Sequence, residues 1–196
     1  MTPRHLRHQG TGTWLLNNRD FQLWHSGSRR HLLLYGPPGW GKTVLSTAVL
    51  DRLTKAGDRL VLGFFFDFGD DSKRSVDGLL RSLAIQLYRG TADRGAALET
   101  LFQSHQYPRS EPTQKDLWET VVQILAAQTK VTILLDALDE STQMHRLLKW
   151  VKDLTSKLEL GHVSLCCTSR PESEIWSVMS EVFKEESCLE RTSDHT

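Results

Sequence analysis

The sequence GPPGWGKT at residues 36–43 decides the fold, because it fits the phosphate-loop pattern G-x-x-x-x-G-K-[ST]. A short apolar run at residues 31–35 precedes it and predicts a strand, and apolar residues at helical spacing follow it over residues 43–56. Such a loop needs glycine, because a Cβ atom would keep backbone N–H groups from converging on phosphate oxygens. The order of strand, glycine-rich loop and helix predicts a phosphate-binding α/β protein.

Within this loop, Lys42 supplies a point charge for phosphate oxygens and Thr43 a hydroxyl ligand for Mg²⁺. The helix that follows presents its positive end to the anion. The alternative is a simple Gly-Pro turn, and the flanking strand and helix argue against it. The residues expected to hold the nucleotide are Gly36, Pro37, Pro38, Gly39, Trp40, Gly41, Lys42 and Thr43.

A second apolar run, VTILLD at residues 131–136, predicts a strand that delivers carboxylates at its C-terminal end. Ligands bind at that edge of open α/β sheets, so we expect Asp136 to hold Mg²⁺ directly or through water. Asp139 and Glu140 lie one turn further and are candidates to orient an attacking water. An apolar strand that ends in acids is also common for structural reasons, but its pairing with the loop favours the functional interpretation.

A third segment, SLCCTSRP at residues 164–171, follows a predicted strand over residues 162–168 and ends in an arginine. Arg170 is a candidate to contact the γ-phosphate, since a planar guanidinium suits phosphate oxygens. The alternative is a surface arginine that caps a strand end. Cys166 and Cys167 must point to opposite faces of the sheet, which favours core packing over a shared metal site.

The remaining pattern indicates further elements of the same α/β unit. Thr113 with Asp116 predicts a capping box that starts a helix running to about Gln128. Leu158 is expected on the apolar side of the longest helix. The other expected elements are a strand over 60–66, helices over 75–89, 95–105 and 142–160, an exposed loop over 107–112, a short strand over 186–190, a disordered tail over 1–12 and a single domain over 13–196.

Composition narrows the class of partner. Lys and Arg number 24, as do Asp and Glu, so the formal net charge of the 196 residues is zero and offers no global field for nucleic acid. The longest strongly apolar run, residues 60–66, is far too short to span a membrane. Three cysteines, two of them adjacent, do not form a secreted disulfide framework. We therefore expect a soluble cytoplasmic protein without nucleic-acid or membrane partners.

The segments GPPGWGKT, LLDALDE and TSRPE, in this order, resemble the NACHT branch of the STAND signal-transduction P-loop ATPases. Residues 10–16 and 21–24 resemble the nephrocystin-type N-terminal NACHT module of fungal NOD-like receptors and ankyrin-repeat proteins. The resemblance covers roughly residues 10–190. It implies a three-layer sandwich of about five mostly parallel strands in the order 5-1-4-3-2, with helices on both faces. That order would place the strand carrying Arg170 between those carrying Lys42 and Asp136.

This resemblance also implies a function. It is that of a signalling switch that binds ATP or GTP with Mg²⁺, hydrolyses it slowly, and self-associates or contacts further receptor domains according to nucleotide state. Position 137 is Ala where many hydrolytic relatives carry Glu, so turnover would depend on Asp139 or Glu140 with Arg170. The resemblance also implies a helical lid and winged-helix parts, and we expect the domain over residues 13–196 to lack them.

Three alternatives remain at this point. One is a nonhydrolysing scaffold, and another is a fragment of a larger NOD-like receptor. A small P-loop metabolite kinase ranks last, because the candidate lid segment, residues 92–112, contains only Arg94 and Arg109.

Overall fold

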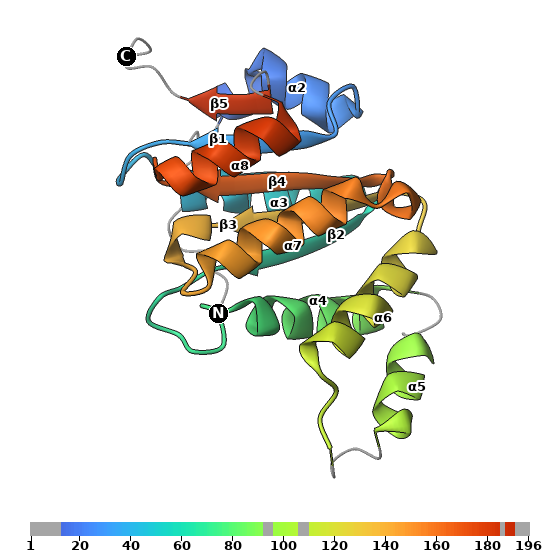
Figure 1. The fold of residues 1–196 in the computed structure, drawn as a ribbon. Helices are drawn as coiled ribbons and strands as arrows, with labels where there is room; N and C mark the ends of the chain where they lie inside the picture. Colours follow the sequence, from blue (N-terminus) through green and yellow to red (C-terminus); the bar gives the residue numbers. More distant parts are fainter. Residues whose placement is uncertain (1–12, 92–95, 106–109, 185–186, 191–196) are drawn as a thin grey trace.

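A sheet of five parallel strands forms the centre of the molecule, in the order β2-β3-β4-β1-β5 (Figure 1). The structure is a computed structural model that describes residues 13–91, 96–105, 110–184 and 187–190. The observed strand order confirms the predicted order 5-1-4-3-2. The strands are β1 (His31–Tyr35), β2 (Leu60–Phe65), β3 (Val131–Asp136), β4 (Val163–Ser169) and β5 (Cys188–Glu190).

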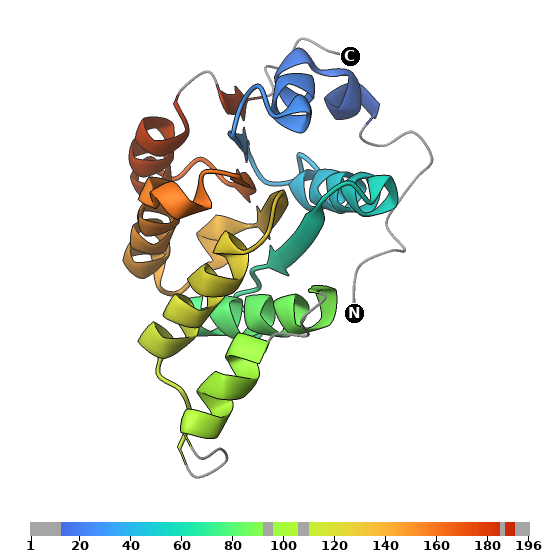
Figure 2. The ribbon, with the colours of Figure 1, turned by 90° about the vertical axis from the view of Figure 1, so that its right-hand side faces the viewer.

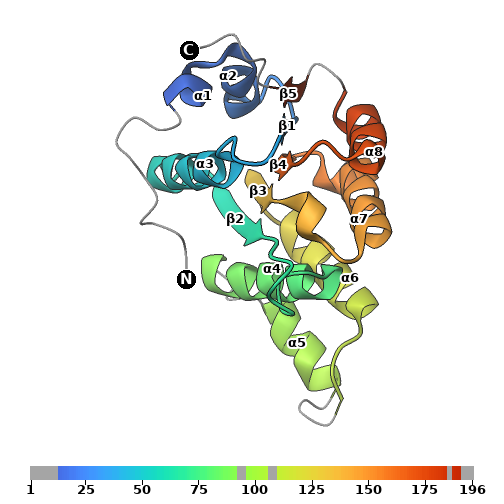
Figure 3. The ribbon, with the colours of Figure 1, turned by 90° about the vertical axis from the view of Figure 1, so that its left-hand side faces the viewer.

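Helices cover both faces of the sheet and make the predicted three layers. Figure 3 shows α1, α2 and α3 on one face and α7 and α8 on the other, and Figure 2 shows α4 and α6 side by side beyond β2. The helices are α1 (Thr13–Asn17), α2 (Arg19–Ser26), α3 (Lys42–Ala56), α4 (Val76–Gly90), α5 (Ala96–Ser104), α6 (Gln114–Ala126), α7 (Met144–Ser156) and α8 (Ser173–Phe183), with 3₁₀ turns η2 (Leu138–Glu140) and η3 (Leu158–Leu160). No helix in these described ranges has the length and apolarity to cross a membrane.

Alternation along the strands divides the core between the two faces. On β1, Leu32 and Leu34 belong to the core cluster on the α3 side, whereas Leu33 belongs to the larger cluster on the face covered by α7 and α8. Cys166 and Cys167 divide in the same way, and both are fully buried. Burial raises the pKa of both thiols, so they stay protonated and apolar in character. The prediction that these cysteines serve core packing is confirmed.

The start of α6 follows the predicted capping box. The Thr113 side chain accepts from the backbone N–H of Asp116, and the Asp116 carboxylate accepts from the N–H of Thr113. The preceding loop was expected to be exposed, and that is wrong for Pro112, which is buried. Pro112 holds the position before the cap, where an apolar residue commonly packs against the fourth helical residue, here the buried Leu117. Residues 107–109 of this loop lie outside the described ranges.

The predicted helix over 142–160 is shorter in the structure, and the expected burial of Leu158 is wrong. Helix α7 ends at Ser156, and Lys157 has an extended backbone with φ −73° and ψ 121°. This break interrupts the helical spacing, so Leu158 is 96% exposed while Leu160 of η3 is buried. A helical period fixes which face a residue occupies only as far as the helix continues.

Arg30 holds this break in place. Its guanidinium donates to three main-chain carbonyls, those of Thr155 at 3.1 Å, Leu160 at 2.7 Å and Val163 at 3.0 Å. These carbonyls come from the end of α7, from η3 and from the start of β4. Their acceptor groups would otherwise lack partners as the helix ends, so a distant side chain sets where α7 stops.

His31 is a buried titratable group where β1 meets β4. The residue is 7% exposed, and its ring stacks on that of Phe183 with the ring centroids 4.7 Å apart. The Nδ1 atom accepts from the backbone N–H of Leu165 at 3.2 Å, which requires the neutral ring. Burial, with a smaller contribution from the charge of Arg30, lowers the pKa of His31 to about 3.

We predict that this histidine makes the fold sensitive to mild acid. Because the folded pKa lies below the unfolded value of 6.5, the unfolded chain binds the proton first. The contribution of His31 to the free energy of unfolding is therefore fully present above pH 6.5. It falls as the pH drops toward 3, by up to about 1.4 kcal/mol per pH unit. Urea unfolding between pH 7.5 and 5 should show a shallower pH dependence for His31→Gln than for the parent, while the exposed-site control His145→Gln follows the parent. Parallel profiles for parent and His31→Gln would contradict this assignment.

Candidate functional site

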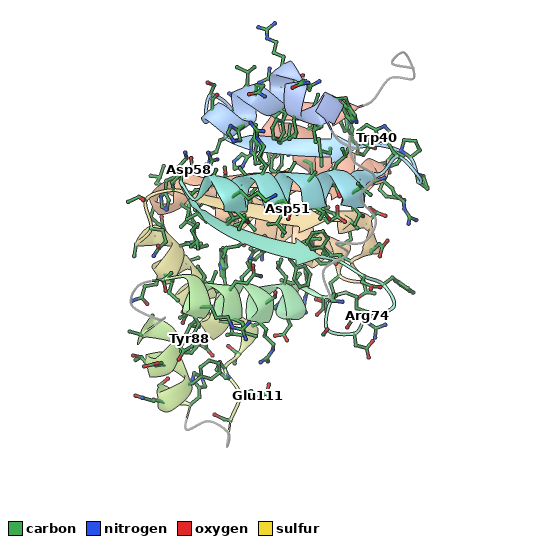
Figure 4. All side chains as sticks on the ribbon, turned by 180° about the vertical axis from the view of Figure 1, so that it is seen from behind. Trp40, Asp51, Asp58, Arg74, Tyr88 and Glu111 are labelled. Carbon is green, nitrogen blue, oxygen red and sulfur yellow. The ribbon has the colours of Figure 1, made fainter. Side chains whose placement is uncertain are left out.

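The candidate site lies where β1, β3 and β4 end. In Figure 4, Trp40 and Arg74 lie toward this end of the strands, and Asp58 lies at the opposite end. The loop over residues 36–41 leaves β1 and enters α3, and the N–H of Gly36 donates to the carbonyl of Ser169 at 3.2 Å. This bond joins the ends of β1 and β4 at the sheet edge where ligands of α/β proteins bind.

The phosphate loop folds around its own lysine. Gly39 and Gly41 have φ of 79° and 80°, a left-handed backbone that disfavours side chains. The ammonium of Lys42 donates to the carbonyls of Gly36 at 2.6 Å and Pro37 at 3.0 Å. Partial burial lowers the pKa of Lys42, and the nearby carboxylates of Asp139 and Asp136 counteract this shift, whereas the charge of Arg170 adds to it. The Lys42 ammonium, which we predict to bind phosphate, therefore lies against the carbonyl groups at the start of the loop.

Asp136 is the most heavily bonded group of the site. The residue is 2% exposed, and its carboxylate accepts from three hydroxyls: Thr43 at 2.7 Å, Ser46 at 2.5 Å and Thr168 at 2.7 Å. Thr43 uses Oδ2, while Ser46 and Thr168 share Oδ1. The two residues predicted as metal ligands, Thr43 and Asp136, are thus in direct contact. Hydroxyl and carboxylate oxygens are ligands that Mg²⁺ accepts.

Ser46 and Thr168 were not predicted as site residues. Ser46 lies three residues beyond Thr43 on α3, so both face the same way, and this spacing is a signal that sequence reasoning missed. Thr168 also accepts from the N–H of Ala137 at 2.9 Å, and Ala137 has a left-handed φ of 57°. Thr168 thereby fixes both the carboxylate of Asp136 and the backbone that follows it.

The three predicted catalytic residues form one cluster. The guanidinium of Arg170 lies 3.2 Å from the Asp139 carboxylate and 3.6 Å from that of Glu140. The backbone N–H of Arg170 also donates to Asp139 at 2.9 Å, and the Asp139 side chain is only 5% exposed. Glu140 accepts in addition from the N–H of Phe68 at 3.3 Å. The cluster therefore contains two carboxylates and one arginine, whose side chain is about half exposed.

Trp40 packs inward rather than toward a phosphate. Its ring lies 5.8 Å from that of Trp14, with the planes at 52°, and both border the core on the α3 side. A Cβ atom built on Gly36 would lie 2.8 Å from the Trp40 ring, so Gly36 is required by this contact. Trp14 belongs to the segment that resembles the nephrocystin-type module, and the pair connects that segment to the phosphate loop.

A groove of about 1020 Å³ begins at Thr43 and Asp136 and follows the outer edge of β2. Thr43, Asp136 and Glu140 line one end of it, while Lys42 is not among its described lining residues. At Gly63 the edge is covered, because the side-chain amide of Gln86 donates to the carbonyl and accepts from the N–H, each at 2.9 Å. The phosphate loop, and not this larger hollow, defines the candidate site.

We predict that removing the Thr168 hydroxyl destabilises the fold more than shortening the side chain does. Thr168→Val leaves the buried N–H of Ala137 without its acceptor and takes one donor from Asp136. Urea unfolding at pH 7 should show a loss of about 2–4 kcal/mol for this variant, from two lost bonds of which one involves a charge. Thr168→Ser keeps the hydroxyl and should lose clearly less. Equal losses for the two variants would show that the methyl group, not the hydroxyl, matters.

Comparisons with known proteins agree with this geometry. A family model described as "Nephrocystin 3, N-terminal" matches residues 10–170. The vegetative incompatibility protein HET-E-1 of Podospora anserina is 29% identical over 167 residues, which is 81% of this chain and 11% of that protein. The chain thus spans about a ninth of the length of this relative.

Two solved structures share the fold. The crystal structure of Cdc6p from Pyrobaculum aerophilum aligns with a TM-score of 0.63 and 14% identity, over 96% of this chain and 46% of that one. The Aeropyrum pernix ORC1 protein, solved in complex with DNA, aligns with a TM-score of 0.60 and 17% identity, over 96% of this chain and 45% of that one. At these identities the likeness establishes the fold alone, and it is an α/β P-loop NTPase fold.

Proposed function

The chain belongs to the nephrocystin 3 N-terminal family, and from this premise we propose that it is a signalling switch that binds ATP or GTP together with Mg²⁺. The observation that carries the proposal is the contact between Thr43 and Asp136 beside the lysine-bearing loop. Loop N–H groups and Lys42 provide donors for phosphate, and the hydroxyl and carboxylate provide oxygens for a hard cation. These are the two halves of a Mg²⁺-nucleotide site.

The residues present fit a magnesium ion. Thr43 and Asp136 would hold it, and when bound it supplies positive charge that neutralises the phosphate oxygens. Ser46 and Thr168 occupy Oδ1 of Asp136 and so keep Oδ2 directed toward Thr43. Lys42 needs to exchange its bonds to the Gly36 and Pro37 carbonyls for phosphate oxygens, which are stronger, charged acceptors.

We propose that hydrolysis is slow. Ala137 offers no carboxylate next to Asp136, so an attacking water would depend on Asp139 or Glu140. Both carboxylates are engaged by Arg170, and Glu140 also by the backbone of Phe68. Arg170 is half exposed, and a γ-phosphate would compete with these carboxylates for its guanidinium. Nucleotide would in this way change the contacts of the segment around Glu140.

The proposed output of this change is altered self-association or altered contact with further domains of a longer receptor. The setting is the cytoplasm, without nucleic-acid or membrane partners. The competing function is a scaffold that binds nucleotide without hydrolysing it, and the engaged state of Asp139 and Glu140 favours it over rapid turnover. The metabolite kinase remains the least supported candidate.

We predict that Lys42→Ala weakens nucleotide binding without unfolding the chain. The substitution removes an ammonium that pairs with phosphate, so affinity for Mg²⁺-ATP or Mg²⁺-GTP should fall by about 2–4 kcal/mol, or about 30- to 1,000-fold. Isothermal titration calorimetry measures it directly. Lys55→Ala, an exposed lysine in the last turn of the same helix, is the matched control and should bind like the parent. Equal nucleotide affinity of Lys42→Ala and the parent would contradict the proposal.

A further prediction separates the roles of the two aspartates. Asp136→Asn should impair binding that depends on Mg²⁺, because it removes the charge opposite Thr43. Asp139→Asn should leave binding nearly intact and abolish whatever hydrolysis occurs, because Asp139 contacts Arg170 rather than the metal position. Calorimetry with Mg²⁺ or with EDTA measures the first effect, and phosphate release measures the second. If both variants lose the same property to the same degree, the division of roles is wrong.

A further inference from the structure

A second pocket, separate from the phosphate loop, lies between α4, α6 and α7. Its volume is about 290 Å³, at the small end of the roughly 300–1,000 Å³ range of ligand pockets. It shares no described lining residue with residues 36–43 or 136–140. The described lining residues are Val76, Leu80, Gln114, Lys115, Trp118, Arg146, Lys149, Trp150 and Asp153.

The apolar part of this pocket is built around two indole rings. Trp118 and Trp150 meet edge to face, with centroids 5.5 Å apart and planes at 64°. Val76 and Leu80 of α4 are buried beside them. Trp150 is 5% exposed, and its indole N–H has no hydrogen-bond partner in the described part of the chain. A buried donor without an acceptor is unfavourable.

The rim of the pocket carries an excess of positive charge. The described lining residues include three cations, Lys115, Arg146 and Lys149, and a single acid, Asp153. Arg146 and Lys149 are exposed and form no ion pair or hydrogen bond with any described residue. The nearest acid to Lys115 is Glu119, at a loose 3.8 Å, and the Lys115 side chain is 80% exposed. These cations are free to meet an incoming anion.

From these observations we propose that the pocket binds a small organic acid with a flat aromatic body and one carboxylate. The aromatic body packs on the two indoles and on Val76 and Leu80, and the carboxylate accepts from the cations on the rim. The volume is large enough for a fused two-ring acid. This site is independent of the proposed nucleotide binding.

The test uses 2-naphthoate as the probe and the full chain labelled with ¹⁵N at its tryptophan side chains. Six tryptophans give six indole N–H resonances, and triple-resonance spectra assign those of Trp118 and Trp150. We expect both to move saturably as naphthoate is added, while the resonance of Trp24, buried on the other face, stays in place. The neutral isostere 2-naphthalenemethanol should bind at least threefold more weakly, since it lacks the charge.

The rim variants decide whether the cations take part. The double variant Arg146→Gln/Lys149→Gln changes only exposed side chains and should weaken naphthoate binding three- to tenfold. Lys152→Gln, on the same helix but outside the pocket, is the matched control and should bind like the parent. Unmoved Trp118 and Trp150 resonances at millimolar naphthoate would overturn the proposal. So would equal binding of the neutral isostere, or a shift of Trp150 with an acidic peptide but none with naphthoate.

Discussion

The carboxylate of Asp136 is the group on which the site depends. It is a buried charge at the end of β3, and burying a charge is strongly unfavourable unless hydrogen bonds replace its hydration. Three hydroxyls provide them, from the phosphate loop, from the next turn of α3 and from β4. One side chain thus ties together the three segments that the sequence marks as functional. The loop, the acid and the arginine come together because β4 lies between β1 and β3.

This arrangement is also the basis for proposing a switch rather than an efficient hydrolase. The acids that follow Asp136 are already paired with Arg170, and the only residue between Asp136 and η2 is an alanine with left-handed backbone. A phosphate that attracts Arg170 would release Glu140, which is bonded to the loop beyond β2 through Phe68. Adjacent bonds from Thr142 to the carbonyl of Arg74 join the same two segments. Short, direct contacts therefore connect the cluster around Arg170 to the loop that follows β2.

From the alternation along strands, sequence reasoning recovered the division of the core between two faces, and it took the strand order and the clustering of Lys42, Asp136 and Arg170 from the family resemblance. It missed what long-range side chains determine. Leu158 was misplaced because α7 ends at Ser156, where Arg30, about 130 residues earlier in the chain, bonds the carbonyl of Thr155 in the last turn and that of Leu160 in η3. Thr168 was missed because a hydroxyl in a strand carries no signal of its partner until the fold brings Asp136 beside it, whereas the spacing of Ser46 from Thr43 on one helix face was a signal that went unused.

The most direct test of the central claim is the dependence of nucleotide affinity on Mg²⁺ in the parent chain. If Thr43 and Asp136 form the metal side of a nucleotide site, calorimetric titration with ATP or GTP should show clearly tighter binding in the presence of Mg²⁺ than in EDTA. We predict at least a tenfold difference, or about 1.4 kcal/mol. Identical affinity with and without the metal, or no binding of either nucleotide, would contradict the claim.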